Sequence, residues 1–328
     1  MLRVDLFDHG RPDQVCRCVE VEDVGAPASD EVVVAIASSA INPADLLIME
    51  GRYPGPEQLP APMGIEGAGR VVEVGATVEG LRPGDKVISL ARCNWAERVR
   101  VKAQQVIRLP EALSFQNAAM LKANPPSAYL MLRDYVDLEP GDWVVQNAAN
   151  SAVGHHIIRL ARARGLRTAN IVRRETLIDE LTAFGGDVVV VEGEELAERL
   201  RARTGREARI KLGIDAVGGT ATMHLAACLS DGGTVVNYGF LSGEPCMITP
   251  HQAILHDITL KGFWLVRFMS AAARADIEAL YDTMAHHFID GTLEVPVEAS
   301  YELRQIDRAL AHAMRSGRHG KVLLDRAL

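Results

Sequence analysis

The sequence predicts an α/β protein with two domains, a small β barrel and a doubly wound parallel sheet. Residues 1–118 hold closely spaced β-branched runs separated by turn residues, a pattern typical of small barrels. From residue 119, apolar strands alternate with helical segments, which indicates a doubly wound sheet. After residue 266 the β signals return, so we expect the C-terminal segment to complete the first domain.

The individual elements follow from the spacing of apolar runs and turn residues. Strands are expected at residues 2–7, 31–37 and 69–75, and residues 78–88 place a Pro83-Gly-Asp turn before another strand. In the second domain, strands are expected near residues 142–147, 168–172, 187–191, 210–216 and 233–238, with helices between them. The remaining segment predicts strands at 258–265, 295–301 and 321–325, and helices at 271–289 and 304–315.

The strand at 142–147 is joined to the following helix by a tight turn of small residues. In such a βαβ unit the turn delivers a pyrophosphate to the helix N-terminus, where free N–H groups attract anions. Ala148, Ser151 and Gly154 stand at the three turn positions, so one of the three usual glycines is present. An ordinary strand-to-helix turn is the alternative interpretation.

Two arginines, Arg173 and Arg174, follow the next strand, with no acidic residue before Glu175. The adenosine ribose of a dinucleotide lies at this strand end, where an acidic side chain favours a free 2′-hydroxyl and arginine accommodates a 2′-phosphate. The sequence therefore predicts a Rossmann domain that binds NADPH. Surface arginines without a ligand are the alternative.

Composition excludes several classes of protein. A net charge of −8 argues against nucleic acid or an anionic membrane as the main partner. No apolar run approaches the roughly 20 residues of a membrane span. The five cysteines are scattered without chelating spacing, so we expect free thiols and no bound metal. The chain opens directly into a strand, and the cytoplasm is the expected compartment.

The order of these elements resembles the medium-chain dehydrogenase/reductase superfamily, through Gly64-Ile-Glu-Gly-Ala-Gly69 and Pro83-Gly-Asp-Lys-Val87. The resemblance implies a GroES-like catalytic domain at 1–118, completed by 267–328, and a Rossmann NADPH-binding domain at 119–266. Zinc-dependent members have a Cys where this chain has Asn42 and a His where it has Ile65. Neither side chain can replace a thiolate or an imidazole, so the resemblance implies a zinc-free enzyme.

Within this superfamily the chain is similar to the zinc-free 2-enoyl thioester reductases. Arg174, Ala152 and Ile65 depart from the pattern of that family. The resemblance therefore still implies the reaction type, but it does not identify the acyl carrier of the substrate. The similar runs are Ile41-Asn-Pro-Ala-Asp45, Gly51-Arg-Tyr-Pro54, Gln146-Asn-Ala-Ala-Asn-Ser-Ala-Val-Gly154, Leu166-Arg-Thr-Ala-Asn-Ile-Val-Arg173 and Lys261-Gly-Phe-Trp-Leu265.

The resemblance implies a catalytic tyrosine, Tyr53, which lies in the Gly-x-Tyr-Pro loop. Reduction of an activated C=C bond needs a proton at the α-carbon, and a phenol suits this role because it keeps its proton at neutral pH. A loop tyrosine that only packs against Pro54 and Pro56 is the alternative.

The resemblance also implies the cofactor-binding residues, which lie mostly at the carboxyl ends of the parallel strands. Simpler alternatives are a helix cap at Asn124, a β-turn at 238–241, a buried strand at 263–266 and a solvated charge at Lys321. The complete set is Asn124, Asn150, Ser151, Ala152, Val153, Arg173, Arg174, Tyr238, Gly239, Phe240, Leu241, Phe263, Trp264, Leu265 and Lys321.

We therefore predict an NADPH-dependent oxidoreductase that reduces the C=C bond of an α,β-unsaturated carbonyl compound. The expected substrate is a 2-enoyl thioester of CoA or of an acyl carrier protein. One alternative is a quinone or small enone or haloacrylate oxidoreductase, and another is a non-catalytic NADPH-binding protein. The resemblance further implies a homodimer formed through the strand near 258–265.

Overall fold

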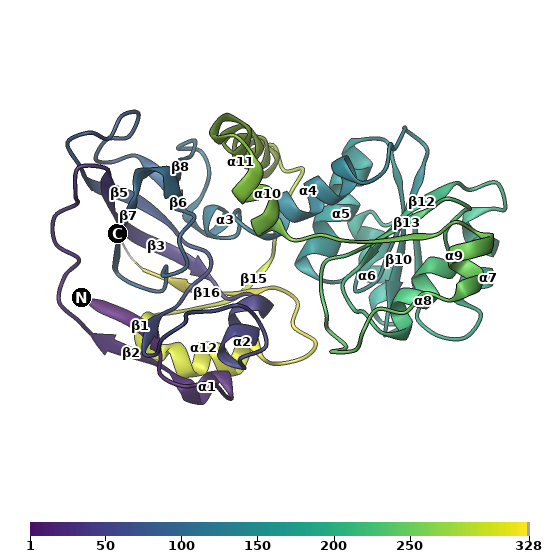
Figure 1. The fold of residues 1–328 in the computed structure, drawn as a ribbon, viewed down its shortest axis with the longest axis horizontal. Helices are drawn as coiled ribbons and strands as arrows, with labels where there is room; N and C mark the ends of the chain where they lie inside the picture. Colours follow the sequence, from purple (N-terminus) through teal and green to yellow (C-terminus); the bar gives the residue numbers. More distant parts are fainter. Residues whose placement is uncertain (327–328) are drawn as a thin grey trace. The chain divides into compact units, whose positions relative to one another are not determined.

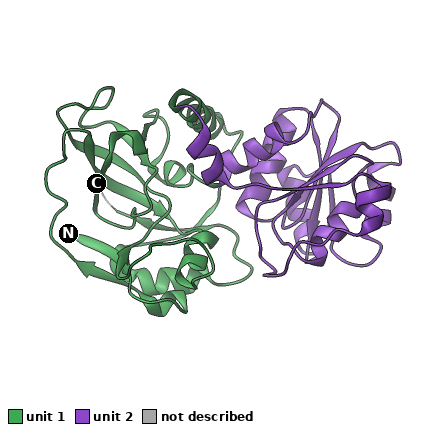
Figure 2. Cartoon of the chain, in the orientation of Figure 1, with its two compact units in different colours: residues 1–123, 274–328 green, residues 124–273 purple. Residues whose placement is uncertain are grey.

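The computed structural model describes residues 1–326, which form two compact units (Figure 2). Unit 1 consists of Met1–Ala123 and the segment that begins at Arg274, and unit 2 is Asn124–Ala273. Both boundaries lie a few residues after the expected positions of 118 and 266. The reason is that helix α4 begins at Asn124 and helix α10 still belongs to unit 2.

Unit 2 is built on a parallel sheet of six strands in the order β11-β10-β9-β12-β13-β14 (Figure 1). The strand order reverses between β9 and β12, which is the arrangement of a doubly wound Rossmann sheet. The predicted fold class of this domain is confirmed. The strands are β9 (Trp143–Gln146), β10 (Arg167–Val172), β11 (Val188–Val191), β12 (Ile210–Asp215), β13 (Thr234–Asn237) and β14 (Thr259–Gly262).

The central strands of this sheet are apolar runs buried on both faces, as parallel sheets require. Val144, Val145 and Val235 are completely buried. No helix among residues 1–326 is long and apolar enough to span a bilayer. The helices of unit 2 are α4 (Asn124–Asp134), α5 (Ala152–Ala163), α6 (Leu177–Phe184), α7 (Leu196–Thr204), α8 (Thr220–Ala227), α9 (Pro250–Leu255) and α10 (Leu265–Ala271).

The segment after β13 departs from the expected strand at 258–265. The strand β14 ends at Gly262, and α10 begins three residues later at Leu265. The helix expected at 271–289 is divided, because Ala272 has the extended backbone angles φ −74° and ψ 147°. As a result, α10 ends at Ala271, and α11 (Arg274–Ile289) starts unit 1 again.

Unit 1 is a β domain with two sheets (Figure 1). A three-stranded sheet has the order β2-β1-β4, and a seven-stranded sheet has the order β15-β16-β3-β5-β6-β8, with β7 paired to β3. The strands are β1 (Leu2–Leu6), β2 (Cys16–Glu20), β3 (Glu31–Ala40), β4 (Ala61–Pro62), β5 (Ala68–Val74), β6 (Lys86–Ser89), β7 (Arg98–Lys102), β8 (Val106–Arg108), β15 (Val297–Tyr301) and β16 (Lys321–Asp325). The helices are α1 (Pro12–Val15), α2 (Pro43–Met49), η1 (Ala103–Gln105), α3 (Phe115–Ala119), α11, η2 (Leu303–Gln305) and α12 (Ile306–Ala313).

The strand β16, from the end of the chain, is an integral part of unit 1. It pairs antiparallel with β3 and parallel with β15. Its apolar residues Val322 and Leu324 join a buried core that also contains Leu6 and Trp95. Residues from both ends of the chain therefore share one hydrophobic core.

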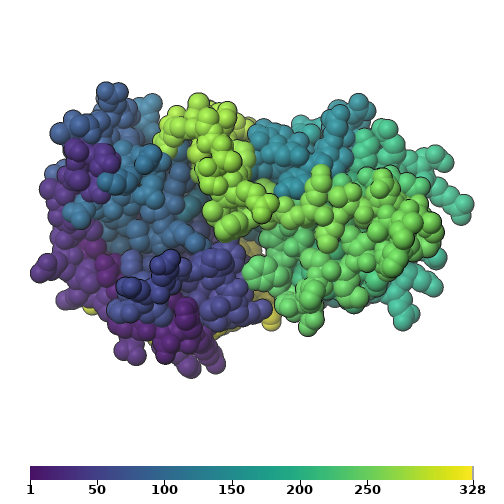
Figure 3. All heavy atoms as spheres, viewed as in Figure 1, coloured from purple at the N-terminus to yellow at the C-terminus, as the bar shows by residue number. Residues whose placement is uncertain are grey.

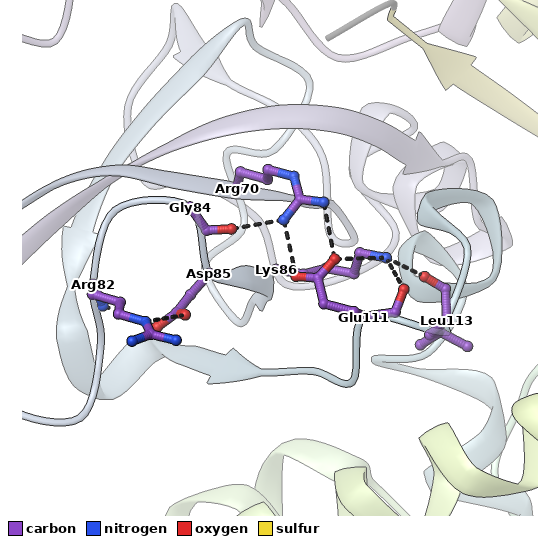
Figure 4. A network of polar contacts seen from close by, with 7 residues as sticks. All are labelled: Arg70, Arg82, Gly84, Asp85, Lys86, Glu111 and Leu113. Carbon is purple, nitrogen blue, oxygen red and sulfur yellow. Dashed lines mark hydrogen bonds and ion pairs between the residues drawn. The ribbon is translucent and has the colours of Figure 1, made fainter.

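The turn predicted at Pro83-Gly-Asp precedes β6 and is held by polar contacts (Figure 4). Gly84 has a φ of +95°, which favours glycine, and its carbonyl accepts a hydrogen bond from Arg70 at 2.7 Å. Arg70 also forms a bidentate ion pair with Glu111, with both N–O distances 3.0 Å. The buried Lys86 amine donates to the carbonyl oxygens of Glu111 and Leu113 at 2.7 and 2.5 Å. These contacts fix the start of β6.

Candidate active site

The turn between β9 and α5 has the geometry of an anion-binding helix N-terminus. Ser151 caps α5, with its hydroxyl accepting a hydrogen bond from the Gly154 N–H at 3.1 Å. The N–H groups of Ala152 and Val153 have no acceptor within residues 1–326. Free N–H groups at the first turn of a helix attract phosphate oxygens. The turn therefore fits the pyrophosphate of a dinucleotide.

Only one position of this turn requires glycine. A Cβ at Gly154 would lie 2.4 Å from the carbonyl oxygen of Ala149, which no side chain tolerates. Ala148 adopts a φ of 47° without being glycine. This explains how the turn keeps its shape with one of the three usual glycines.

Arg173 and Arg174 follow β10 directly, and both side chains are exposed. Neither forms an ion pair within the described part of the chain. Strand β10 pairs with β9 in parallel, with Asn170 opposite Gln146. The two arginines and the β9–α5 turn therefore lie at the same edge of the sheet. Two guanidinium groups without a carboxylate partner are suited to a phosphate.

A buried carboxylate, Asp215 at the end of β12, organises this edge, and sequence reasoning missed it. Its Oδ1 accepts hydrogen bonds from the Asn147 amide at 2.6 Å and from the N–H groups of Val217 and Gly218 at 2.9 and 3.1 Å. The signal available in the sequence was an acid ending an apolar strand, Ile210-Lys-Leu-Gly-Ile-Asp215.

The second oxygen of Asp215 connects β12 to the next strand. Oδ2 accepts from the hydroxyl of Thr222 at 2.6 Å and from the amide of Asn237, at the end of β13, at 3.0 Å. Asn147 in turn accepts a hydrogen bond from the N–H of Ala216 at 2.8 Å. One buried side chain therefore ties together the carboxyl ends of β9, β12 and β13.

The segment 238–241 follows β13, and the structure brings its first residue to the β9–α5 turn. Burial raises the pKa of the Tyr238 phenol, and a hydrogen bond with Ser151 opposes this effect. A Cβ at Gly239 would lie 2.6 Å from the carbonyl oxygen of Ala216, so the segment passes close to the loop after β12. Phe240 and Leu241 are exposed. Two predicted cofactor-binding segments are therefore in contact.

The three residues Phe263, Trp264 and Leu265 lie after β14, not within it. The Phe263 N–H donates to the carbonyl oxygen of Asn237 at 2.8 Å, and its ring meets Tyr135 edge-on with centroids 6.3 Å apart. Trp264 is exposed at the N-cap of α10.

Three more of the predicted cofactor-binding residues lie in unit 2. Asn124 is the first residue of α4, Asn150 is exposed in the β9–α5 turn, and Val153 is buried.

Tyr53 belongs to unit 1, in the loop after α2. Gly51 has a φ of +71°, and the Arg52 N–H donates to the carbonyl oxygen of Leu47 at 2.8 Å, so the loop turns back onto α2. The Tyr53 side chain packs against the core of unit 1. The guanidinium carbon of Arg92 lies 5.7 Å from the centre of its ring.

A buried network of charged groups surrounds Asn42, at the N-cap of α2. The Asn42 amide donates to Glu66 Oε2 at 2.6 Å, and its oxygen accepts from the Lys321 amine. Asp45 accepts from the N–H groups of Asn42 and Ile65 at 2.9 and 3.0 Å. Burial raises the pKa of Asp45 to about 7. Sequence reasoning did not foresee this network.

The network extends to Lys122 and Ala123, the last two residues of the first segment of unit 1. Glu66 Oε1 accepts from the Ala123 N–H at 2.8 Å. The Lys122 amine donates to the carbonyl oxygens of Ile65 and Ala91 at 2.5 and 2.8 Å. Burial lowers the pKa of Lys122 to about 8, opposed by Glu66 and assisted by Arg92.

Lys321, which the resemblance places at a cofactor phosphate, is not the solvated charge of the alternative interpretation. Its amine is buried in unit 1 and bonded to Asn42. Burial lowers the pKa of this amine, with Glu66 and Asp45 opposing that effect. The side chain is therefore already engaged by the network, and we leave it out of the proposed cofactor site.

These positions do not fit a catalytic zinc. Both polar atoms of the Asn42 amide are engaged, by Glu66 and Lys321, and Ile65 has no donor atom. Among residues 1–326, no three His, Cys, Asp or Glu side chains are grouped so that they could hold a metal ion.

Comparison with known proteins gives matches over both units. Residues 28–112 match the family described as alcohol dehydrogenase GroES-like domain, and residues 152–286 match the family described as zinc-binding dehydrogenase. The chain is 32% identical over 330 residues to the mitochondrial enoyl-(acyl-carrier-protein) reductase of Dictyostelium discoideum, covering 98% of this chain and 94% of that protein. It is 34% identical over 313 residues to the corresponding protein of Homo sapiens, covering 94% and 84%.

Solved structures with the same fold cover the whole chain. The quinone oxidoreductase of Escherichia coli, complexed with NADPH, has a TM-score of 0.89 and 25% identity over 99% of this chain and 100% of that one. A mitochondrial 2-enoyl thioester reductase heterodimer from Candida tropicalis has a TM-score of 0.86 and 24% identity over 99% of both chains.

The expected cytoplasmic location is wrong by this comparison. The relatives that match most of the chain are named as mitochondrial enzymes. The expectation rested on the chain opening directly into a strand, and that observation does not separate the cytoplasm from the mitochondrial interior. The free cysteines do not separate them either, because both compartments allow reduced thiols.

Proposed function

The chain belongs to the enoyl reductases of the medium-chain dehydrogenase/reductase superfamily, and we propose that it reduces the C=C bond of a 2-enoyl thioester with NADPH. The observation that carries this proposal is the edge of the unit 2 sheet. At this edge lie two arginines without an ion pair and helix N–H groups without an acceptor, as far as residues 1–326 show, which is what a phosphorylated dinucleotide requires.

When bound, NADPH supplies the hydride. The N–H groups of Ala152 and Val153 would hold its pyrophosphate, and Arg173 and Arg174 would bind its 2′-phosphate. Ser151 stays the cap that orients α5. The remaining proposed contacts come from Asn124, Asn150, Tyr238, Gly239, Phe240, Leu241, Phe263, Trp264 and Leu265.

Tyr53 is the proposed proton donor. As the hydride reaches the β-carbon, the α-carbon becomes basic and takes the phenolic proton. The O–H bond of Tyr53 breaks, a C–H bond forms, and the electron pair stays on the phenolic oxygen. Water then returns a proton to that oxygen. The partly buried position of Tyr53 against the core of unit 1 supports this role, because the ring has few orientations.

The proposed substrate is a thioester, since the curated relatives are named enoyl-(acyl-carrier-protein) reductases. A second candidate is a quinone or small enone, favoured by the likeness to the quinone oxidoreductase. The two differ in the need for a thioester handle. No zinc is required in either reaction, which agrees with the engaged amide of Asn42.

The test follows NADPH absorbance with crotonyl-CoA, a quinone and a simple enone side by side, and repeats each with NADH. We expect fastest turnover with crotonyl-CoA and NADPH. Faster turnover of the quinone would favour the second candidate. Binding of NADPH without oxidation by any of the three would leave a non-catalytic binding protein. Tyr53→Phe should lower turnover strongly and leave the Kd of NADPH nearly unchanged.

We also propose that the protein forms a homodimer through β14. This strand is the edge of the unit 2 sheet, and all four of its residues are exposed. Three exposed apolar side chains accompany it, Ile254, Leu255 and Leu260. In Figure 3 the green segment that holds α9 and β14 lies on the visible face of unit 2. Edge-to-edge pairing would satisfy the free backbone groups of the strand. Light scattering that gives a monomer mass at micromolar concentration would reject the dimer.

A further inference from the structure

Arg92 is an exposed cation that the reaction proposed above does not use. It lies in unit 1, between β6 and β7, and its guanidinium carbon is 5.7 Å from the centre of the Tyr53 ring. Within residues 1–326 the Arg92 side chain forms no ion pair with a carboxylate. Its charge is therefore not neutralised by a neighbour and acts on the ring that it faces.

The backbone at Arg92 is held in place by buried polar contacts. The carbonyl oxygen of Ala91 accepts hydrogen bonds from the Lys122 amine and the Asn94 amide, both at 2.8 Å. The Ala91 N–H donates to the Ser89 hydroxyl at 3.2 Å. Asn94 is completely buried and also donates to the carbonyl oxygen of Gly64 at 3.2 Å. These contacts fix the backbone on both sides of Arg92.

Two loops far apart in sequence therefore converge on one contact. The loop after α2 presents the Tyr53 ring with one side against the core, and the fixed loop after β6 presents a cation to it. A guanidinium within about 6 Å of an aromatic ring is attracted to the electrons of that ring. The attraction grows when the ring carries a negative charge, because a full charge replaces a quadrupole.

We propose that Arg92 is a positioning residue for Tyr53: its guanidinium holds the ring in place and stabilises the phenolate that remains after the proton leaves. This inference rests on the proposed function, in which the Tyr53 O–H bond breaks and its electron pair stays on oxygen. The cation neither gives nor takes a proton. It acts on the proton-transfer step through Tyr53 and not on binding of the cofactor.

The test compares Arg92→Gln, Arg92→Lys, Tyr53→Phe and the double variant Tyr53→Phe/Arg92→Gln, with crotonyl-CoA and NADPH. Arg92→Gln should lower kcat roughly 3- to 30-fold, the range expected for a cation–π contact, and leave KM within about twofold. Arg92→Lys should restore most of kcat, because it keeps the charge. In the Tyr53→Phe background, Arg92→Gln should change kcat by less than twofold.

The matched control is Arg98→Gln, an exposed arginine of β7 that pairs with Asp23 at 2.8 Å. It should leave kcat and KM unchanged. An Arg92→Gln enzyme with wild-type kcat, or with only a raised KM, would overturn the inference, as would equal losses with and without the Tyr53 hydroxyl. If the turnover of Tyr53→Phe is too low to measure, the inference is decided by the loss of kcat in Arg92→Gln and its recovery in Arg92→Lys. Wild-type turnover in Tyr53→Phe would instead refute the proposed donor.

Discussion

Replacing Asp215 by asparagine tests whether this carboxylate holds the cofactor edge of unit 2 together. The variant keeps the size of the side chain but exchanges one oxygen for an NH2 group, which cannot accept hydrogen bonds. In the wild type Oδ1 accepts three bonds and Oδ2 accepts two. The less damaging orientation therefore places the NH2 group at Oδ2, facing Thr222 and Asn237.

The magnitude follows from what each donor can do next. The new NH2 group can donate one hydrogen to the Thr222 hydroxyl, which rotates to accept it. Its other hydrogen faces the Asn237 NH2 group, which keeps the carbonyl oxygens of Asp215 and Gly239 as acceptors at 3.3 and 2.9 Å, so this hydrogen of the new amide has no acceptor. A buried donor without a partner costs about 1–3 kcal/mol. The three bonds left at Oδ1 also lose the assistance of a full charge. We expect unit 2 to lose about 2–4 kcal/mol of unfolding free energy, and the affinity for NADPH to fall.

Urea denaturation and a fluorescence titration with NADPH measure these two effects. The control is Asp231→Asn, because Asp231 is exposed and its side chain, within residues 1–326, bonds only to His256, at 2.7 Å. It should change neither quantity. An Asp215→Asn protein with the denaturation midpoint and NADPH affinity of the wild type would show that the Asp215 carboxylate is not needed at this sheet edge, and would refute the reasoning.

Three further predictions concern both units. The double variant Arg173→Ala/Arg174→Ala should raise the Kd of NADPH about 10- to 100-fold, because charged hydrogen bonds contribute about 1.5–3 kcal/mol. The Kd of NADH, measured in a parallel titration, should not change. Gly154→Ala should lower NADPH affinity and thermal stability, because its Cβ meets Ala149 at 2.4 Å. Asp45 has a pKa raised to about 7 in the folded state, so its contribution to the unfolding free energy should fall as the pH rises from about 4 to 7.

Each of these has its own control. For the arginines, equal losses of NADPH and NADH affinity would contradict recognition of the 2′-phosphate. For the glycine, a Gly154→Ala protein with the NADPH affinity and melting temperature of the wild type would contradict the close contact with Ala149. For the carboxylate, the wild-type unfolding free energy minus that of Asp45→Asn should decline between pH 4 and 7. A flat difference would contradict the raised pKa.

The fold was largely predictable because it depends on local patterns. Apolar runs alternating with helices gave the doubly wound sheet, and the Pro83-Gly-Asp turn lies where expected, before β6. The strand at 258–265 was too long by three residues at its end, since Phe263 and Trp264 are apolar like strand residues. Only the backbone shows that Leu265 starts a helix.

The site was predictable only in part. Motif residues such as Ser151 and Arg173 could be placed, because a βαβ unit fixes where a turn and a strand end must lie. Asp215, Asp45 and Arg92 could not be singled out, since their importance comes from partners distant in sequence. The contact of Lys321 with Asn42 was missed for the same reason, because the two residues lie far apart in the sequence.

The pairing of β16 with β3 has a consequence for biosynthesis. Strand β3 (Glu31–Ala40) is made before unit 2, but its neighbour Lys321–Asp325 is made after unit 2. Unit 2 is one uninterrupted stretch between them. The nucleotide-binding half is therefore free to fold during translation, while the half that holds Tyr53 must wait, incomplete, until β16 has also been made.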